Sequence, residues 1–311
     1  MDARCRTWTA WASLVPLTVV SLCSCRQTTP STQPARGSLP VTVSIPPQRY
    51  FVGRVGGKHV DVSVLLAPGQ SPATYEPTPK EMVKLARSGV YFRIGVPFER
   101  QVVEKIGSAL EDLRIVDTRK GIELRASDPH DHRAGGGHAH HHHHEQDPHV
   151  WMNPRLVKVQ ADIVCRTLCQ IDPAHRTEYE GNCRAFKADL DRTDAKIAAS
   201  LGSLRGGTFY VFHPSLGYFA DAYGLEQVAI ESGGKQPTAK QLAALIDRAK
   251  RDGVRLIFVQ PQFDKRNAET VAAEIGGAVV PLDPLAEDYI ENLLHVAAEI
   301  RRALATAPDG S

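Results

Sequence analysis

Short apolar segments alternate with amphipathic segments twice along this chain of 311 residues, once before residue 118 and again after residue 207. In the first stretch, the β-branched runs Val41–Ile45 and Val60–Leu66 each lie next to a segment whose apolar residues have helical spacing. Such alternation predicts parallel sheets covered by helices, since neighbouring parallel strands are joined by crossover helices. The predicted fold class is therefore α/β, with two α/β lobes.

A long helical segment separates the two stretches. After an amphipathic helix predicted over 153–172, a second helix is predicted over 173–204, with Gly181 and Gly202 as its weak points. A helix of about 30 residues is roughly 45 Å long, which exceeds what one small domain needs. We expect it to join the two lobes, with loops at the strand ends facing a cleft between the lobes.

The N-terminus has the pattern of an export signal. Arg4 and Arg6 precede the apolar stretch Thr7–Leu22, and small residues follow. The sequence "LCSC" that ends at Cys25 resembles a bacterial lipobox, which predicts cleavage before Cys25 and attachment of lipid to it. A plain secretory signal cut in the same region is the alternative. Residues 26–39 are rich in Pro, Ser, Thr and Gln and predict a flexible tether.

The composition indicates a folded protein and gives no sign of nucleic-acid binding. Hydrophobic residues make up 42% of the chain and the formal net charge is only +2, so no basic excess suggests a nucleic-acid partner. Beyond the signal the cysteines are Cys165, Cys169 and Cys183, an odd number that cannot all pair. One disulfide that uses Cys183 and three buried thiols are both open. The predicted segments are a signal at 1–25, a tether at 26–39, an N-terminal lobe at 40–172, a linking helix at 173–204 and a C-terminal lobe at 205–311.

Three candidate metal ligands lie at the ends of predicted elements. His149 precedes a helix, His213 directly follows a buried strand, and Asp283 directly follows another strand. Imidazole and carboxylate groups suit zinc, manganese or iron. Taken singly, these residues could be a turn residue, the end of a strand and a helix N-cap before proline. Their combination at strand and helix ends favours a metal site in the cleft.

A histidine-rich tract precedes the first of these candidates, inside a loop predicted over 128–146. Its internal, interrupted position argues against a purification tag, and a plain solvated loop is the alternative. Several neutral imidazoles close together bind divalent metals weakly, which favours a metal-collecting arm made pliable by the glycines at 135–137. Its histidines, the auxiliary metal ligands of this prediction, are His130, His132, His138, His140, His141, His142, His143 and His144.

Spaced motifs over nearly the whole chain beyond the signal resemble one family of bacterial proteins. The motifs are "PGQSPATYEPTP", "GVPFE", "DPHVWMNP", "FHPSLGYFADAYGL", "PTAKQLAALIDRAKRDGVRLIFVQPQF" and "LDPLAEDYIENL". In this order they resemble the zinc/manganese-type (cluster A-I, TroA-like) solute-binding proteins of ABC importers, in the zinc branch with a histidine-rich loop. The resemblance implies two α/β lobes joined by a rigid helix, with the metal site between the lobes. It also implies a lipid-anchored protein, in the periplasm or on the outer face of the cytoplasmic membrane, that delivers Zn²⁺ to an ABC-type permease.

Carried over to this chain, the family's metal ligands fall on His149, His213 and Asp283. The fourth ligand of the family, a histidine in the loop "PGxxPHxYEP", is replaced here by Ala73, which has no donor atom. Water, a histidine of the tract, or Gln70 or Glu76 on the same loop would then complete the coordination. The resemblance and the tract together favour zinc, while manganese and iron stay open.

Two other functions compete with transport. An open coordination position is what a zinc-dependent hydrolase needs, but no Glu or Asp is placed by motif as a general base, and the sequence contains no H-E-x-x-H. A surface adhesin of the same family is the second alternative. The prediction is metal binding without catalysis, by a monomer.

Overall fold

The computed structural model describes residues 37–107, 113–126, 146–231 and 237–305. The predicted lipidation residue Cys25 and the histidine-rich tract lie outside these ranges. Within them, no helix combines the length and the apolar character that crossing a membrane would require.

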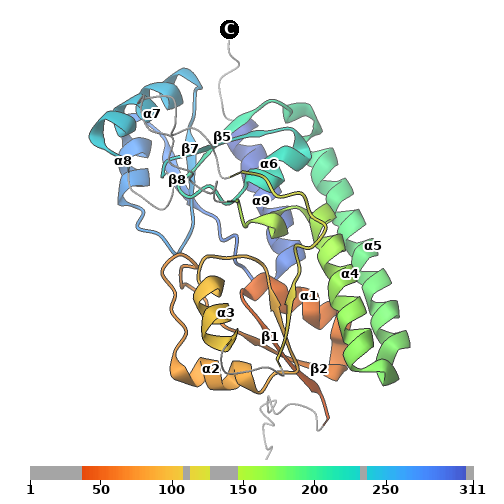
Figure 1. Ribbon diagram of the computed structural model, residues 1–311. Coiled ribbons are helices and arrows are strands. Elements are labelled where there is room, and N and C mark those ends of the chain that lie inside the picture. The colour runs from red at the N-terminus through yellow and green to blue at the C-terminus, as the bar shows by residue number, and fades with distance from the viewer. Residues whose placement is uncertain (1–36, 108–112, 127–145, 232–236, 306–311) are drawn as a thin grey trace, which may run out of the picture. The chain divides into compact units, whose positions relative to one another are not determined.

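Two four-stranded parallel sheets define an N-lobe and a C-lobe (Figure 1). The strand orders are β2-β1-β3-β4 and β6-β5-β7-β8, so the same topology occurs twice. The strands are β1 (Leu39–Val43), β2 (Val60–Val64), β3 (Val90–Arg93), β4 (Arg114–Asp117), β5 (Thr208–Val211), β6 (Glu226–Ala229), β7 (Leu256–Val259) and β8 (Ala278–Pro281). The prediction of two α/β lobes is confirmed.

The strand order creates one topological switch point in each lobe. The chain leaves β1 toward β2 on one side, and β3 returns to the other side of β1, with Val43 paired to both Val64 and Phe92. The same happens around β5, which lies between β6 and β7. Ligands of open parallel sheets bind beyond the carboxyl ends of the strands at such points. The residues that follow β5 and β7 are therefore placed to form a site.

Helices cover both sheets, and their starts follow local capping signals. Thr78 and Thr238 each form a capping box with a residue three positions later, and Asn153 caps a helix that has Pro154 in its first turn. The helices are α1 (Pro46–Gly56), α2 (Pro79–Ala86), α3 (Glu99–Gly107), α4 (Pro154–Ile171), α5 (Arg176–Leu201), α6 (Gly217–Tyr223), α7 (Ala239–Arg251), α8 (Arg266–Glu274) and α9 (Tyr289–Ala305).

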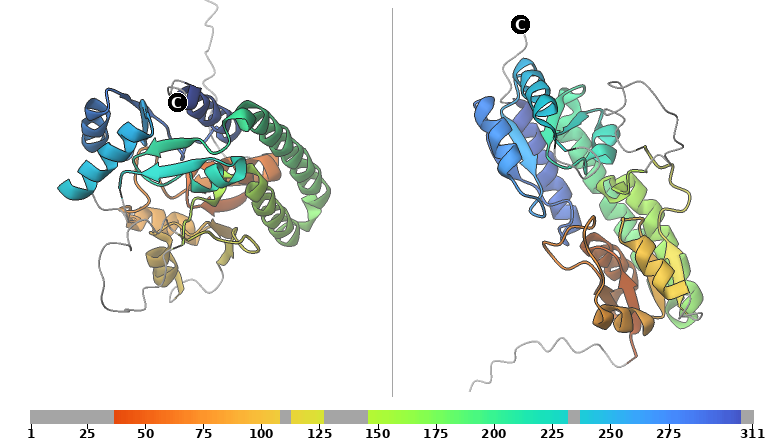
Figure 2. Two further views of the ribbon diagram at one scale, coloured as in Figure 1. Left: turned by 90° about the horizontal axis from the view of Figure 1, so that it is seen from above. Right: turned by 60° about the vertical axis from the view of Figure 1, so that its left-hand side comes forward.

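The long helix predicted over 173–204 is α5, with a short 3₁₀ turn at each end. Its buried residues recur every three or four positions and so form one stripe: Tyr179, Cys183, Phe186, Leu190, Thr193, Ile197 and Leu201. The helix packs against α4 and α1, and also against α9, which in turn packs on β5 of the C-lobe. Figures 1 and 2 show α4 and α5 side by side along the molecule. One helix thus joins both lobes.

Two helices begin after turns that contain candidate metal ligands. Helix α6 begins at Gly217, after a turn in which the N–H of Ser215 bonds to the carbonyl of His213. Helix α9 begins at Tyr289, after a turn in which the N–H of Ala286 bonds to the carbonyl of Asp283. Both candidate ligands therefore lie in loops between a strand and a helix.

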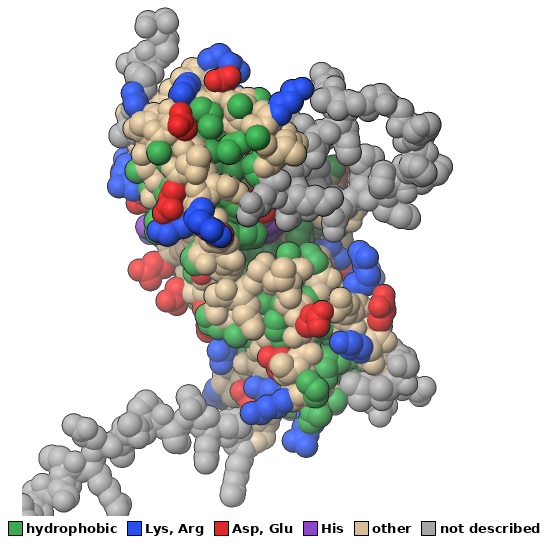
Figure 3. Space-filling model, turned by 90° about the vertical axis from the view of Figure 1, so that its left-hand side faces the viewer, with side chains coloured by type: hydrophobic (Ala, Val, Ile, Leu, Met, Phe, Trp, Pro, Cys, Tyr) green, Lys and Arg blue, Asp and Glu red, His purple; other side chains and the backbone are tan. Residues whose placement is uncertain are grey.

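Two hydrophobic clusters make up the core. The larger one is continuous between the lobes and includes Phe51 and Trp151 together with Phe209 and Tyr289. Both lobes accordingly belong to one compact unit, 35–311. The smaller cluster lies between the other face of the C-lobe sheet and helices α7 and α8. Hydrophobic side chains also gather on the surface over this part of the C-lobe (Figure 3).

The cysteines Cys165, Cys169 and Cys183 are free and buried where α4 meets α5. Burial, together with the neighbouring thiols of Cys183 and Cys169, raises the pKa of Cys165 to about 12. Since the thiolate is the reactive form, these groups behave as small apolar side chains. The sequence left a disulfide and buried thiols open, and the structure has the thiols.

Candidate metal centre

His213 lies at the switch point of the C-lobe, two residues beyond the end of β5. Its backbone is held by Gln260, which follows β7: the Gln260 side-chain oxygen accepts from the His213 N–H at 3.1 Å, and its amide nitrogen donates to the His213 carbonyl at 2.8 Å. The Gln260 side chain therefore continues the hydrogen bonding between β5 and β7 beyond the ends of these strands. The position of the His213 backbone is thus fixed by the sheet.

The His213 ring is oriented by two side chains. Its Nδ1 lies 2.5 Å from Glu231 Oε1, and Phe263 stacks on the ring with centroids 4.7 Å apart. Glu231 is brought there because the ladder continues past β6, with its N–H bonded to the carbonyl of Phe212. Burial lowers the pKa of His213, although the hydrogen bond to Glu231 opposes the shift. The imidazole is therefore neutral at neutral pH, which is the form that binds metal.

His149 is oriented by the carboxylate two residues before it. Asp147 Oδ1 lies 2.7 Å from His149 Nδ1 and also accepts the His149 N–H at 2.9 Å. Burial alone would raise the pKa of Asp147, but the hydrogen bond and charge of His149, together with Arg125, hold it below its usual value. Asp147 is thus an anion that accepts a hydrogen bond from the Nδ1–H of His149. That arrangement leaves Nε2 as the nitrogen that can bind a metal.

The rings of the two histidines, one before α4 and the other after β5, lie close together. Their ring centroids are 5.1 Å apart and the ring planes are inclined by 72°. In both residues Nδ1 is engaged by a carboxylate, so both present Nε2. A carboxylate behind each ligand is the usual support of metal-binding histidines, because it sets the ring tautomer and increases the basicity of the ligating nitrogen. The structure therefore brings His149 and His213 together as a preoriented pair.

Asp283 follows β8, and one oxygen of its carboxylate already accepts two hydrogen bonds. Its Oδ1 accepts from Gln262 Nε2 and from the N–H of Leu285, both at 2.9 Å. Both bonds fall on one oxygen, so Oδ2 is the atom available to a metal. The same segment is tied to the His149 segment, since Trp151 Nε1 donates to the carbonyl of Pro284 at 2.8 Å.

The loop that carries Ala73 is anchored on both sides of that residue. The Ala73 side chain is exposed, and its N–H donates to Ser71 Oγ at 3.3 Å. Tyr75 is buried, with its hydroxyl bonded to the carbonyl of Leu65 and its ring edge-on to Phe98 at 4.8 Å. The loop thus presents residue 73 outward on a fixed backbone.

Gln70, Glu76 and the tract histidines are the other candidates for the fourth ligand. Gln70 uses its side-chain oxygen to accept the N–H of Ala67 at 2.8 Å, within its own loop, and Glu76 is exposed. The tract histidines lie outside the described residues. Over 37–107, 113–126, 146–231 and 237–305, no three His, Cys, Asp or Glu side chains converge as a metal site. A pair of histidines, rather than a closed ligand set, is what the described chain contains.

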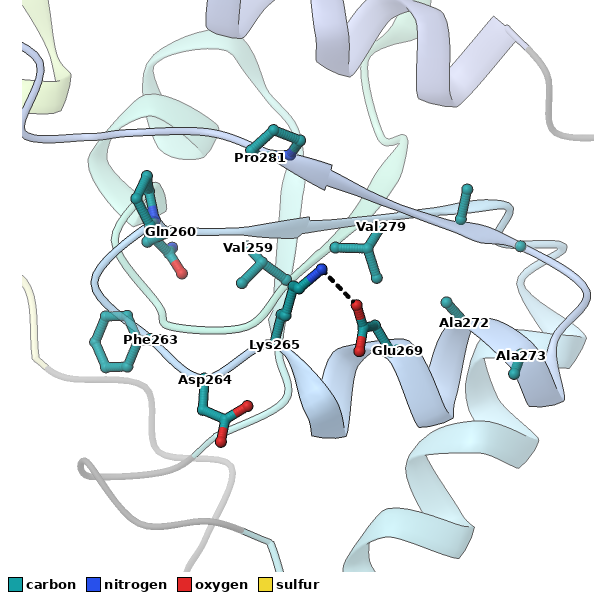
Figure 4. A pocket seen from close by; sticks show the side chains of 13 residues that line it. Val259, Gln260, Phe263, Asp264, Lys265, Glu269, Ala272, Ala273, Val279 and Pro281 are labelled. Carbon is teal, nitrogen blue, oxygen red and sulfur yellow. Dashed lines mark ion pairs between the residues drawn. The ribbon is translucent and has the colours of Figure 1, made fainter. Parts of the chain in front are cut away.

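A cavity of about 760 Å³ borders the site, between the edge of the C-lobe sheet and α8 (Figure 4). Gln260 and Phe263, which hold His213, also line this cavity. The rest of the lining is mostly apolar, apart from Asp264 and the ion pair between Lys265 and Glu269 at 2.8 Å. None of its thirteen described lining residues is histidine or cysteine. Its chemistry therefore differs from that of a zinc site.

The supporting side chains were not singled out by sequence reasoning. Asp147 stands inside the recognised motif "DPHVW", and its spacing of two from His149 is the signal that could have identified it. Glu231 and Phe263 carry no such signal, because they are 18 and 50 positions from His213 and reach it only through the sheet.

Replacing Glu231 by alanine is expected to weaken Zn²⁺ binding by about 10- to 100-fold, because the His213 ring loses the acceptor that orients it. Competition with a chelating dye measures the change. Glu226→Ala is the control, since Glu226 is a glutamate on β6 itself whose exposed pair with Arg248 should matter little. Equal affinities for the two variants would show that Glu231 does not support the site.

Sequence comparison identifies relatives along most of the chain. The high-affinity zinc uptake system protein ZnuA of Bacillus subtilis is 28% identical over 270 residues, which cover 86% of this chain and 85% of that protein. A putative metal-binding protein of Chlamydia trachomatis is 26% identical over 258 residues, covering 83% of this chain and 88% of the relative. The zinc-binding lipoprotein AdcA of Streptococcus pneumoniae is 28% identical, over 95% of this chain and 61% of its own length.

Solved structures agree. A crystal structure of ZnuA matches with a TM-score of 0.79 and 40% identity, over 86% of this chain and 99% of that one. A zinc-bound deletion mutant of ZnuA matches with a TM-score of 0.79 and 38% identity, over 87% of this chain and 100% of that one. The model of the family described as zinc-uptake complex component A periplasmic matches residues 41–303. The chain therefore belongs to the ZnuA family.

Proposed function

We propose that this protein binds Zn²⁺ outside the cytoplasm and delivers it to an ABC-type metal permease in the membrane. The observation that carries the proposal is the pair His149 and His213, whose Nδ1 atoms are both engaged by carboxylates so that both Nε2 atoms can bind one ion. Family membership supports zinc as the cargo. Asp283 would supply the third ligand through Oδ2, and water or a histidine of the tract would supply the fourth.

Calorimetric titration of the metal-free protein tests this function. Zn²⁺ is expected to bind more tightly than Mn²⁺ or Fe²⁺, since two imidazoles favour the later and softer divalent ions. If Mn²⁺ binds more tightly than Zn²⁺, the cargo is manganese and not zinc. Failure of every divalent ion to bind would remove the transport function altogether.

Attachment to the membrane would place the protein beside its permease. Lipid on Cys25 would hold it in the periplasm or at the outer face of the cytoplasmic membrane, and residues 26–39 would act as the tether. The relative AdcA of Streptococcus pneumoniae is named a lipoprotein, which supports such an anchor. A monomer suffices for this role, because His149, His213 and Asp283 all belong to one chain.

The histidine-rich tract would collect metal near the site. The residues that flank it are close together, since Ala126 and Gln146 form an antiparallel bridge three residues before His149. An arm tethered at that point raises the effective concentration of bound metal beside the histidine pair. Its ligands must be ordered on binding, so each of its sites is weaker than a preformed one.

Replacing residues 128–145 by a short glycine linker should lower the stoichiometry to about one Zn²⁺ per protein and keep the tightest site. The linker preserves the bridge between Ala126 and Gln146, so the backbone before His149 is undisturbed. Calorimetry and metal analysis measure the two quantities. Loss of the tightest site would instead identify a tract histidine as its fourth ligand.

A further inference from the structure

Two chain segments meet directly before His149, and a hydroxyl group from the C-lobe lies between them. One segment leads up to Ala126 and the other starts at Gln146, on either side of the tract. Ala126 and Gln146 form an antiparallel bridge, and the N–H of Asp147 donates to the carbonyl of Arg125 at 3.0 Å. A regular antiparallel pair would also join the N–H of Arg125 to the carbonyl of Asp147.

The hydroxyl of Tyr218 occupies the place of that second bond. It accepts the N–H of Arg125 at 2.9 Å and donates to the carbonyl of Asp147 at 3.0 Å. A phenol can do both at once, since it has one donor and free lone pairs. Tyr218 is buried, so the two backbone groups receive from it what water would otherwise supply.

Close packing of the first turn of α6 makes this insertion specific. At Gly217 a Cβ atom would lie 2.4 Å from Arg125 Nη1 and 3.1 Å from Asp147 Oδ2, so any larger residue there would displace the Arg125 guanidinium from its present position. The Arg125 guanidinium also pairs with Asp221, one turn further along α6, at 3.1 Å. Helix α6 thus contacts both the Arg125 segment and the Asp147 segment.

The same residues lead to the metal site by a short path. Asp147, whose carbonyl Tyr218 holds, orients the His149 ring through its carboxylate. Tyr218 is five residues beyond His213 in one continuous turn and helix. The Tyr218 hydroxyl therefore connects the segment that carries His149 to the segment that carries His213, although the two histidines are more than sixty residues apart in the chain.

We propose that Tyr218 is a positioning residue for metal binding, because its hydroxyl sets the spacing of Arg125 and Asp147 and so holds His149 against His213. This inference rests on the proposed zinc function. Without the hydroxyl, the Arg125 N–H and the Asp147 carbonyl would close to a direct bond. That closure moves Asp147, and His149 with it, away from the geometry that matches His213.

The test compares two tyrosines of α6 in the full chain. Tyr218→Phe removes the hydroxyl between Arg125 and Asp147, while Tyr223→Phe removes the hydroxyl of another buried tyrosine, which donates to Asp194 on α5 at 3.0 Å. Zn²⁺ affinity is measured by chelator competition and the urea midpoint by circular dichroism. Tyr218→Phe should weaken Zn²⁺ binding by about 10- to 100-fold. Tyr223→Phe should leave it unchanged, even where both variants lose stability. Equal Zn²⁺ affinities for the two variants would overturn the inference.

Two further readouts separate positioning from folding. In the Co²⁺-loaded protein, the visible absorption of the ion should change in Tyr218→Phe and not in Tyr223→Phe. In the native chain, saturation with Zn²⁺ should slow hydrogen exchange of the Arg125 amide, because coupling between the hydroxyl contact and the metal is reciprocal. Exchange that is insensitive to Zn²⁺ would contradict the inference even if Tyr218→Phe does not fold. If the native protein binds no Zn²⁺ at all, the proposed function fails instead.

Discussion

Replacing His213 by alanine should weaken Zn²⁺ binding by at least 100-fold. The change removes a ligand nitrogen outright, and loss of a mere supporting partner of a ligand already lowers affinity by about 10- to 100-fold. It also leaves the buried carboxylate of Glu231 without its imidazole partner, which should lower stability by about 1–3 kcal/mol. Chelator competition gives the affinity, and thermal unfolding shows that the variant is folded at the temperature of the assay.

His175→Ala is the matched control for this variant. His175 has the same carboxylate arrangement, with Nδ1 2.6 Å from Asp172, but it lies beyond the far end of α4 from His149. Those 18 helical residues separate it from the site by about 27 Å. The control should retain native Zn²⁺ affinity. An unchanged dissociation constant in His213→Ala would remove this residue from the site.

Replacing Ala73 by histidine should tighten Zn²⁺ binding by at least 10-fold. The family has a histidine at this loop position. The loop of this chain has two contacts that would hold such a histidine in place: the Tyr75 ring packs on Phe98, and the Tyr75 hydroxyl donates to the carbonyl of Leu65. The new imidazole would displace a water or a loosely held tract histidine and complete a tetrahedron. A ligand on a fixed backbone loses little entropy on binding, and the gain in affinity follows from that.

Thr74→His tests whether position 73 itself matters. Thr74 is exposed on the same loop, so Thr74→His adds an imidazole one residue away from the position at which the family has its histidine. Dye competition on the two variants and the native chain should show tighter binding for Ala73→His only. Weaker binding in Ala73→His would mean that another group, such as Glu76, already fills the position. Equal gains in both variants would mean that any nearby imidazole suffices.

The element pattern and the candidate ligands were accessible from the sequence. Strand and helix periodicities are local properties, so runs such as Val60–Leu66 and the helix over 173–204 predicted elements that the structure confirms within a few residues. The positions of His213 after a buried strand and of Asp283 after another were readable for the same reason. The absence of a donor at Ala73 also follows directly from the residue type. Each of these conclusions depends on neighbours along the chain.

The supporting contacts of the site were decided only by the tertiary structure. Glu231 and Phe263 reach His213 because β5 lies between β6 and β7 in the sheet, an order that no local pattern encodes. The contact of Tyr218 with Arg125 and Asp147 likewise joins segments on both sides of the tract. The burial of Cys165, Cys169 and Cys183 as free thiols depends on how α4 packs on α5. Side-chain orientation depends on such long-range packing, because hydrogen bonds and ring contacts form only where separate segments approach within a few ångströms.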